Sequence, residues 1–380
     1  MIVIIIFAGA AYICICKQQG RNVGSAKISR EPQKKLNGNV AATTAGSRKE
    51  IGQMLFFEKR LSVDGTVSCA SCHDPAMAFS SRDAIAIGIH QIPGTRNVPT
   101  LLNARFNNSY FWDGRVRTLE EQAKQPLLNP KEMGMETETA LVARVASIPE
   151  YRESFGRVFG RQGITLNTIA KAIAAYERTL LSKNSPFDRF IAGNTNAITN
   201  AQKRGWKLFK GKAQCISCHI FSGNSSLFTD LKFYNTGVGV IDFSRSVSEI
   251  KGTVTGDTTS QAHTEGISEL GRYLVTRQPP DIGAFKTPTL RDVELTFPYM
   301  HNGSIKTLLD VVRFYNEGGR RNPYLDPKIH PLRMTDSEMS ELVEFLRALT
   351  SDDVLRQTQS AKPQTRAPVP FPETNTNFNP

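Results

Sequence analysis

The sequence of 380 residues predicts a mainly α-helical protein with two related domains and long loops. Apolar residues recur at helical spacing over 165–182 and over 335–349, and Thr335 with Glu338 forms a capping box that opens the second helix. The alternation of apolar and polar residues that is typical of strands is weak throughout. Gly, Ser and Thr dominate 223–264, which predicts an irregular loop.

A Cys-x-x-Cys-His motif occurs twice. The two copies are Cys69-Ala-Ser-Cys72-His73 and Cys215-Ile-Ser-Cys218-His219. In this spacing two thiols bond the edge of a porphyrin, and the adjacent His becomes an axial ligand of its iron. Zinc is disfavoured because it takes four N or S ligands and each motif offers three. A thioredoxin-type redox pair does not use the His, and disulfide pairing leaves the repeated His unexplained. The sequence therefore predicts two covalently bound haem c groups.

Both motifs follow a similar stretch, Gly52 to Phe56 in the first case and Gly205 to Phe209 in the second. Each stretch predicts a short helix that leads into a haem loop, which indicates a duplicated unit. Thr199 and Gln202 form a capping box ahead of the second copy.

The predicted fold class is therefore mainly α, with two cytochrome c-like haem domains and long loops. We expect an export signal or N-terminal anchor over 1–16, a basic polar linker over 17–47, a first haem domain over 48–190, a second haem domain over 195–352 and a disordered tail over 353–380.

The first residues predict an exported protein. Ile2 to Cys16 is an unbroken apolar run, shorter than a typical span and closer to the core of an export signal. Half of the formal net charge of +12 follows it, between Lys17 and Glu50. That segment is either an ordinary linker or a tether to an anionic membrane surface. No aromatic residues alternate with the basic ones, so nucleic-acid binding is not expected. Since haem c is attached outside the cytoplasm, we expect a periplasmic location or the outer face of the inner membrane.

Several further motifs resemble those of the bacterial di-haem cytochrome c peroxidase family, including its MauG-like branch. The resemblance covers roughly residues 48–350. The motifs are Arg96-Asn97-Val-Pro99-Thr-Leu-Leu-Asn103, Phe111-Trp112-Asp113-Gly114-Arg115, Glu120-Glu-Gln122 with Pro126, Asn129-Pro-Lys-Glu132-Met133-Gly134, Phe285-Lys-Thr-Pro288-Thr-Leu-Arg291 and Pro298-Tyr-Met-His301-Asn-Gly303.

The resemblance implies that peroxide reacts at the first haem and that Glu132 moves its proton. A carboxylate suits this task because it can take a proton from one oxygen and return it to the other. Gln122 and Pro126 match residues that line the same pocket. Trp112 matches a residue that carries electrons between the two haems. The plainer alternatives are a solvated loop acid for Glu132 and a core aromatic for Trp112.

The resemblance also implies a calcium ion, with Asn97 as a ligand beside main-chain carbonyl oxygens. Turn chemistry at Asn97 is an equal alternative.

His90 resembles a His that covers the first iron in many family members. Its loop is about one residue shorter here, and Pro93 restricts how that loop can fold. We therefore favour a His90 that does not cover the iron.

The second iron needs an outer axial ligand. The position that is Met in the peroxidase branch and Tyr in the MauG-like branch is Tyr315 here. Met raises the reduction potential of a haem, whereas a phenolate stabilises the oxidised states. The other candidates in the sequence are Met300, Met334, His301 and His330.

Three functions agree with these residues. The first is reduction of hydrogen peroxide with electrons from a small cytochrome c or copper protein. The second is a MauG-like oxidation of a residue on a partner protein, which Tyr315 favours. The third is a plain electron carrier, against which Glu132 argues because a carrier has no use for such an acid. The oligomeric state is left open, and a homodimer is among the alternatives.

Overall fold

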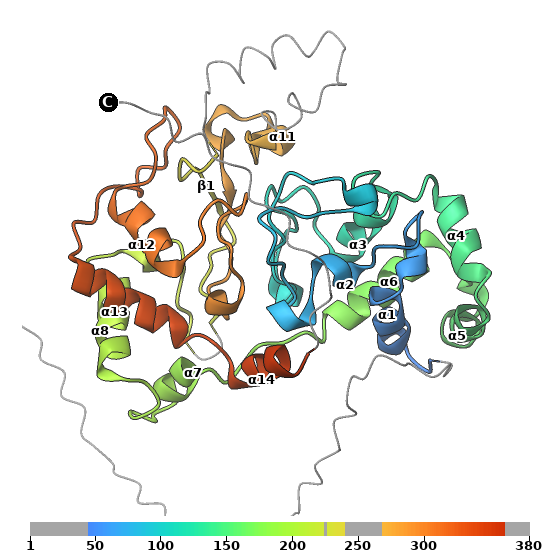
Figure 1. Cartoon of the computed structure of the whole chain (residues 1–380), viewed down its shortest axis with the longest axis horizontal. Helices are drawn as coiled ribbons and strands as arrows, with labels where there is room; N and C mark the ends of the chain where they lie inside the picture. Colours follow the sequence, from blue (N-terminus) through green and yellow to red (C-terminus); the bar gives the residue numbers. More distant parts are fainter. Residues whose placement is uncertain (1–44, 224–225, 240–267, 362–380) are drawn as a thin grey trace, which may run out of the picture. The chain divides into compact units, whose positions relative to one another are not determined.

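A computed structural model describes residues 45–223, 226–239 and 268–361, which lie in one compact unit over Ala41–Pro380. This part of the chain is mostly helical, so the predicted helical class is confirmed (Figure 1). The named strands of the described residues are β1, Phe233–Tyr234, and β2, Phe285–Lys286, which pair antiparallel. The predicted signal or anchor over 1–16 and nearly all of the linker over 17–47 lie outside the described residues. Within the described residues, no helix is both long and apolar enough to cross a bilayer.

The helices come in two series, one before and one after about residue 195. The first series comprises α1 (Arg48–Phe56), α2 (Cys69–Cys72), α3 (Leu119–Leu128), α4 (Glu138–Ala146), α5 (Pro149–Phe159), α6 (Leu166–Glu177) and α7 (Pro186–Ile191). The second comprises α8 (Asn200–Lys210), α11 (Tyr273–Thr276), α12 (Leu308–Asn316), α13 (Asp336–Arg347) and α14 (Asp352–Ser360). The predicted capping boxes at Thr199 and Thr335 are present, at the N-termini of α8 and α13.

Each half contains a closely packed helix pair, α1 on α6 and α8 on α13 (Figure 1). A Cβ atom added at Gly52 would lie 1.8 Å from the carbonyl oxygen of Ala172. A Cβ atom at Gly205 would lie 2.0 Å from the carbonyl oxygen of Glu341. Both glycines therefore permit an approach that no other residue allows, and the same contact in both halves supports the duplication.

The duplication extends to the loops that follow the Cys-x-x-Cys-His motifs. The side-chain oxygen Oδ1 of Asn103 accepts a hydrogen bond from the N–H of Ser182 at 3.1 Å. In the second half, Oδ1 of Asp292 accepts one from the N–H of Ser351 at 2.8 Å. Each bond joins a loop to the chain that follows the long helix of its own half, α6 or α13.

Two backbone hydrogen bonds join the halves in a reciprocal way. The N–H of Asn97 donates to the carbonyl of His301 at 2.8 Å, and the N–H of Lys286 donates to the carbonyl of Trp112 at 2.9 Å. The sequence places Asn97 and Lys286 at the same point of the two Pro-Thr-Leu motifs, and Trp112 and His301 at the same point of the two later turns. The two halves therefore meet through equivalent groups.

The predicted disordered tail over 353–380 is wrong for its first residues, because α14 occupies Asp352–Ser360. Val354 is 3% exposed and packs in a cluster that includes Phe79 and Leu180 of the first half. Asp352 also pairs with Arg189 at 2.9 Å. These partners lie far away in sequence, so local composition gave no sign of them. Residues 362–380 lie outside the described residues.

The helix contact at Gly52 gives a stability test. Gly52→Ala should lower the free energy of unfolding by about 1–3 kcal/mol, because the added methyl group forces α1 away from α6. Gly156→Ala is the matched control: it lies within α5, and its Cβ would have no neighbour within 4 Å. That control should be more stable by about 0.5–1 kcal/mol, because alanine loses less backbone entropy in a helix. Denaturant unfolding followed by circular dichroism measures both, and equal effects would contradict the packing.

Candidate haem sites

The first Cys-x-x-Cys-His motif lines a cavity of about 470 Å³. Cys69 and Cys72 are the first and last residues of α2, and His73 follows directly. The ring nitrogen Nδ1 of His73 donates to the carbonyl of Phe79 at 3.1 Å. This bond fixes the ring and leaves Nε2 available to a metal, the usual arrangement of a ligating His.

The second motif lines a smaller cavity of about 210 Å³ in the same way. Cys215, Cys218 and His219 all contribute to its wall. Nδ1 of His219 donates to the carbonyl of Phe228 at 2.8 Å. Each motif therefore brings two thiols and one oriented imidazole to the wall of its own cavity.

These residues fit haem better than a bare metal ion. Among the described residues, no group of three or more His, Cys, Asp and Glu side chains is placed to hold an ion. The four motif cysteines form no disulfide bond within this part of the chain. Burial lowers the pKa of His73 to about 4 and raises the pKa of Cys215 to about 12. A neutral imidazole is the form that binds iron, and an unpaired thiol is the form that haem attachment requires.

Glu132 lies on the wall of the first cavity with Gln122 and Pro126, as the sequence predicted for all three. Gln122 and Pro126 belong to α3, and Glu132 belongs to the loop that follows it. The side chain of Glu132 is half-buried, and its Oε1 accepts a hydrogen bond from Asn129 Nδ2 at 2.8 Å. Burial raises the pKa of Glu132 above its usual value, although Arg115 and the Asn129 bond oppose this. The group is therefore a carboxyl that can hold a proton more firmly than a solvated acid does.

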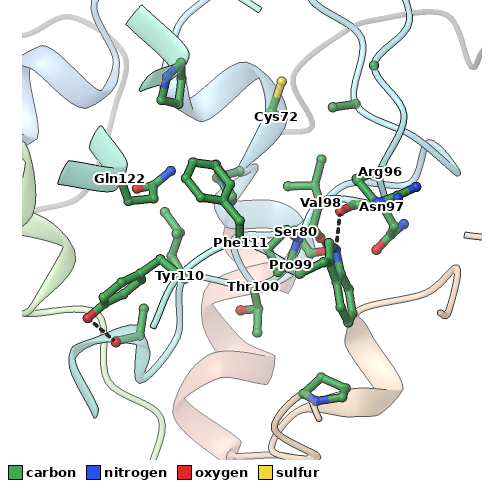
Figure 2. A pocket seen from close by; sticks show the side chains of 18 of the residues that line it. Cys72, Ser80, Arg96, Asn97, Val98, Pro99, Thr100, Tyr110, Phe111 and Gln122 are labelled. Carbon is green, nitrogen blue, oxygen red and sulfur yellow. Dashed lines mark hydrogen bonds between the residues drawn. The ribbon is translucent and has the colours of Figure 1, made fainter. Parts of the chain in front are cut away.

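Other side chains complete the first cavity. Figure 2 shows Gln122 and Tyr110 on one side of the view and Arg96 and Asn97 on the other, with Phe111 between them. The hydroxyl of Tyr110 donates to the carbonyl of Ala104 at 3.2 Å. Apart from Tyr110, these residues come from the motifs that bear the family resemblance.

Trp112 contributes to the walls of both cavities. Its Nε1 donates to the carbonyl of Asn97 at 2.9 Å, and its ring centroid lies 6.4 Å from that of His301 in an edge-on arrangement. The indole is thus held in one orientation between the two sites.

A partly buried row of three linked side chains, which the sequence did not reveal, lies beside Trp112. Arg96 pairs with Glu269 at 2.6 Å and also donates to the carbonyl of Ser268. Glu269 Oε2 lies 2.7 Å from Nε2 of His301, whose ring stacks on Phe285 with centroids 3.5 Å apart. Burial alone would raise the pKa of Glu269, but the bond to His301 and the charge of Arg96 lower it below the usual value. In the sequence Glu269 follows a segment rich in Gly, Ser and Thr, and no local pattern marks it as a functional residue.

Tyr315 lies on the wall of the second cavity, on α12. Helices α3 and α12 both begin after a capping threonine, Thr118 and Thr307. Pro126 follows Thr118 by the same number of residues as Tyr315 follows Thr307. Tyr315 therefore occupies in the second cavity the position that Pro126 occupies in the first. Burial raises the pKa of the Tyr315 phenol. The other candidate ligands Met300, Met334, His301 and His330 line the same cavity, but His301 is engaged with Glu269.

The structure places the side chain of His90 on the surface and that of Asn97 in the interior. The His90 side chain is 62% exposed, and its Nδ1 lies 3.6 Å from Asp64. His90 does not contribute to the cavity wall. Asn97 is buried, and its Nδ2 donates to the carbonyls of Asp83 at 3.4 Å and Ala84 at 3.1 Å.

Comparison with known proteins agrees with this site. Residues 47–196 match the family model described as di-haem cytochrome c peroxidase. Cytochrome-c peroxidase IdrP1 of Pseudomonas sp. (strain SCT) is 37% identical over 336 residues, which cover 85% of this chain and 86% of that protein. Cytochrome c551 peroxidase of Nitrosomonas europaea is 35% identical over 80% of each chain. Methylamine utilization protein MauG of Methylorubrum extorquens is 34% identical, over 80% of this chain and 78% of the relative.

Solved structures give the same result. A MauG-like protein associated with microbial copper homeostasis superposes with a TM-score of 0.68 at 30% identity, covering 83% of this chain and 92% of that chain. The diheme peroxidase BthA from Burkholderia thailandensis has a TM-score of 0.66 at 26% identity, covering 81% and 87%. The chain belongs to the di-haem cytochrome c peroxidase family, which confirms the resemblance seen in the sequence. It is an oxidoreductase of that class with haem c cofactors.

Haem content tests the two cavities separately. The double variant Cys69→Ala with Cys72→Ala should retain one haem per chain, because each pair of thiols serves its own cavity. The matched variant Cys215→Ala with Cys218→Ala should also retain one, and the unchanged protein should hold two. The pyridine haemochrome assay on denatured protein measures covalent haem. Loss of both haems in either variant, in a chain that still folds, would contradict independent sites.

Proposed function

We propose that this protein reduces hydrogen peroxide to water with electrons from a small redox protein, a cytochrome c or a copper protein. The observation that carries the proposal is a half-buried carboxyl group, Glu132, on the wall of the larger cavity, which Gln122 also lines. Bound haem supplies the iron that exchanges electrons with peroxide. The overall reaction takes one peroxide, two electrons and two protons and yields two waters.

Glu132 performs the proton transfer in this proposal. Its carboxylate takes the proton from one peroxide oxygen and returns it to the other, so that the leaving oxygen departs as water. Asn129 holds the carboxyl in place through the 2.8 Å hydrogen bond. Burial keeps the proton affinity of Glu132 high enough for it to act as an acid after it has acted as a base.

Trp112 provides the path for electrons between the two cavities. Its ring lies on the wall of both, and its hydrogen bond to Asn97 keeps the ring in one orientation. Electrons from the donor protein enter on the side of the second cavity, where Tyr315 would help to hold the second haem. The exposed His90 leaves the first cavity open without prior reduction.

Calcium, location and assembly belong to the same proposal. Asn97 lies among main-chain carbonyls of Asp83 and Ala84, and oxygen ligands of this kind suit calcium once the amide turns its oxygen toward the ion. The basic segment before Glu50 agrees with export and with a tether at the outer face of the inner membrane. A homodimer is the proposed assembly.

A MauG-like oxidation of a partner protein is the second candidate. Tyr315 favours it, because an oxygen ligand stabilises oxidised iron. The 34% identity to a MauG protein agrees with this alternative without favouring it over peroxide reduction. A plain electron carrier is not supported, because it would not need Glu132 or an open cavity.

Replacing the acid tests the proposal. Glu132→Gln should lower peroxide turnover with reduced cytochrome c by about 100- to 10,000-fold, because the amide cannot accept the proton. Glu136→Gln is the matched control, since Glu136 is an exposed acid four residues away. Stopped-flow oxidation of the donor measures both variants. If Glu132→Gln retained full turnover, Glu132 would have no part in the reaction.

The second ligand has a test of its own. Tyr315→Phe should change the electron paramagnetic resonance signal of the second haem, because the phenyl ring offers no oxygen to iron. The signal of the first haem should stay as it was. Tyr273→Phe, on α11 and not itself on the wall of either cavity, should leave both signals unchanged. An unaltered second signal in Tyr315→Phe would assign the ligand to another residue.

A further inference from the structure

Glu177 is a buried acid that the proposed mechanism does not use. It is the last residue of α6, is 4% exposed and lies on the wall of the first cavity. Its Oε2 atom has no hydrogen-bond partner among the described residues. An unpaired polar atom in a protein interior costs about 1–3 kcal/mol, so its presence calls for a physical reason.

The nearest charged groups do not supply that reason. Arg178 directs both terminal nitrogens at Glu120, with contacts of 2.7 and 2.8 Å, and so leaves Glu177 without a salt bridge. Burial raises the pKa of Glu177 to about 8; the charge of Arg178 acts in the opposite direction, and the charge of Glu120 adds to the rise. The carboxyl therefore holds a proton at neutral pH and can release it when a positive charge comes near.

The second half of the protein shows that the fold does not need this acid. The glycine contacts of the two helix pairs align Ala172 of α6 with Glu341 of α13. Ala172 precedes Glu177 by the same number of residues as Glu341 precedes Leu346. Leu346 is buried and lies on the wall of the second cavity. The same position is therefore apolar in one cavity and acidic in the other.

We propose that Glu177 is a second proton-holding group of the first cavity, which takes up a proton when the haem there gains an electron and releases it when that electron leaves. Gain of an electron removes one positive charge from the iron. Because a positive charge favours the ionised carboxylate, its loss raises the pKa of a nearby carboxyl. One proton accompanies one electron, and the O–H bond of Glu177 is the only bond made or broken. The inference requires a haem in the first cavity and does not depend on peroxide reduction.

The other titratable groups near Glu177 do not compete for this role. Burial raises the pKa of the Tyr110 and Tyr176 phenols, so both stay neutral. The sulfur of Cys69 is bonded to haem in the mature protein and cannot titrate. The salt bridge between Glu120 and Arg178 stays charged, since it lowers the pKa of the acid and raises the pKa of the base. Asp113 and Glu132 are the remaining acids on the cavity wall. Asp113 pairs with Arg115 at 3.0 Å, so Glu132 is the acid that the test must separate from Glu177.

The test is the midpoint potential of the first haem as a function of pH, measured by spectroelectrochemistry on the full chain with both haems. In the unchanged protein the potential should fall by about 59 mV per pH unit over the window between the pKa values of Glu177 in the oxidised and reduced states. Glu177→Leu, which copies the second half, and Glu177→Gln should each lose this one-proton slope. Glu132→Gln should retain it, and so should Glu136→Gln, which alters an exposed acid outside the cavity wall.

Two further readouts make the outcome decisive. Redox-difference infrared spectra should contain a protonated-carboxyl band that both Glu177 variants lack, and the second haem should keep the same pH dependence in all variants. Equal slopes for the first haem in the unchanged protein and in Glu177→Leu would overturn the proposal. Failure of both Glu177 variants to hold the first haem would overturn it too, because the residue would then serve assembly. Full turnover in Glu132→Gln with an intact slope would instead contradict only the peroxide mechanism.

Discussion

The reciprocal pair of hydrogen bonds between the halves is the constraint on which the rest of the structure depends. Asn97 donates its N–H to the carbonyl of His301, and Lys286 donates its N–H to the carbonyl of Trp112. Each bond joins a segment beside one cavity to a turn from the other half. Because both ends of each bond are backbone groups, their positions are fixed by the fold of the loops. Trp112 consequently lies against both cavities, where a fixed aromatic ring can serve electron transfer.

The duplicated halves are similar in framework and different in chemistry. The glycine contacts and the oriented imidazoles repeat, so each half forms a cavity with two thiols and one His. The equivalent wall positions then diverge: Pro126 corresponds to Tyr315, and Glu177 corresponds to Leu346. The first cavity has acids on its wall, and α3 places no side chain there that could bind iron. The second cavity has the phenol of Tyr315 and the apolar side chain of Leu346 at the equivalent positions. This wall suits an iron that only exchanges electrons.

The sequence predicted the features that depend on neighbours along the chain. The capping boxes at Thr199 and Thr335 and the helical stripe of α6 are local patterns, and the structure confirms them. The haem motifs and the residues around Glu132 carried enough signal to predict the first cavity. Residues 353–360 were predicted wrongly because they belong to α14, whose Val354 packs against the other half. Glu177 was not found, because its burial results from residues distant in sequence and its own surroundings in α6 suggest an ordinary helix end.

The central claim is that the two cavities hold unlike irons, one open on its outer side and one closed by an oxygen ligand. Electron paramagnetic resonance of the oxidised protein as isolated tests this claim most directly. The account predicts one high-spin ferric signal, from the first haem, and one low-spin signal with nitrogen and oxygen axial ligands, from the second. Two low-spin signals, or a second haem with a sulfur ligand, would contradict it.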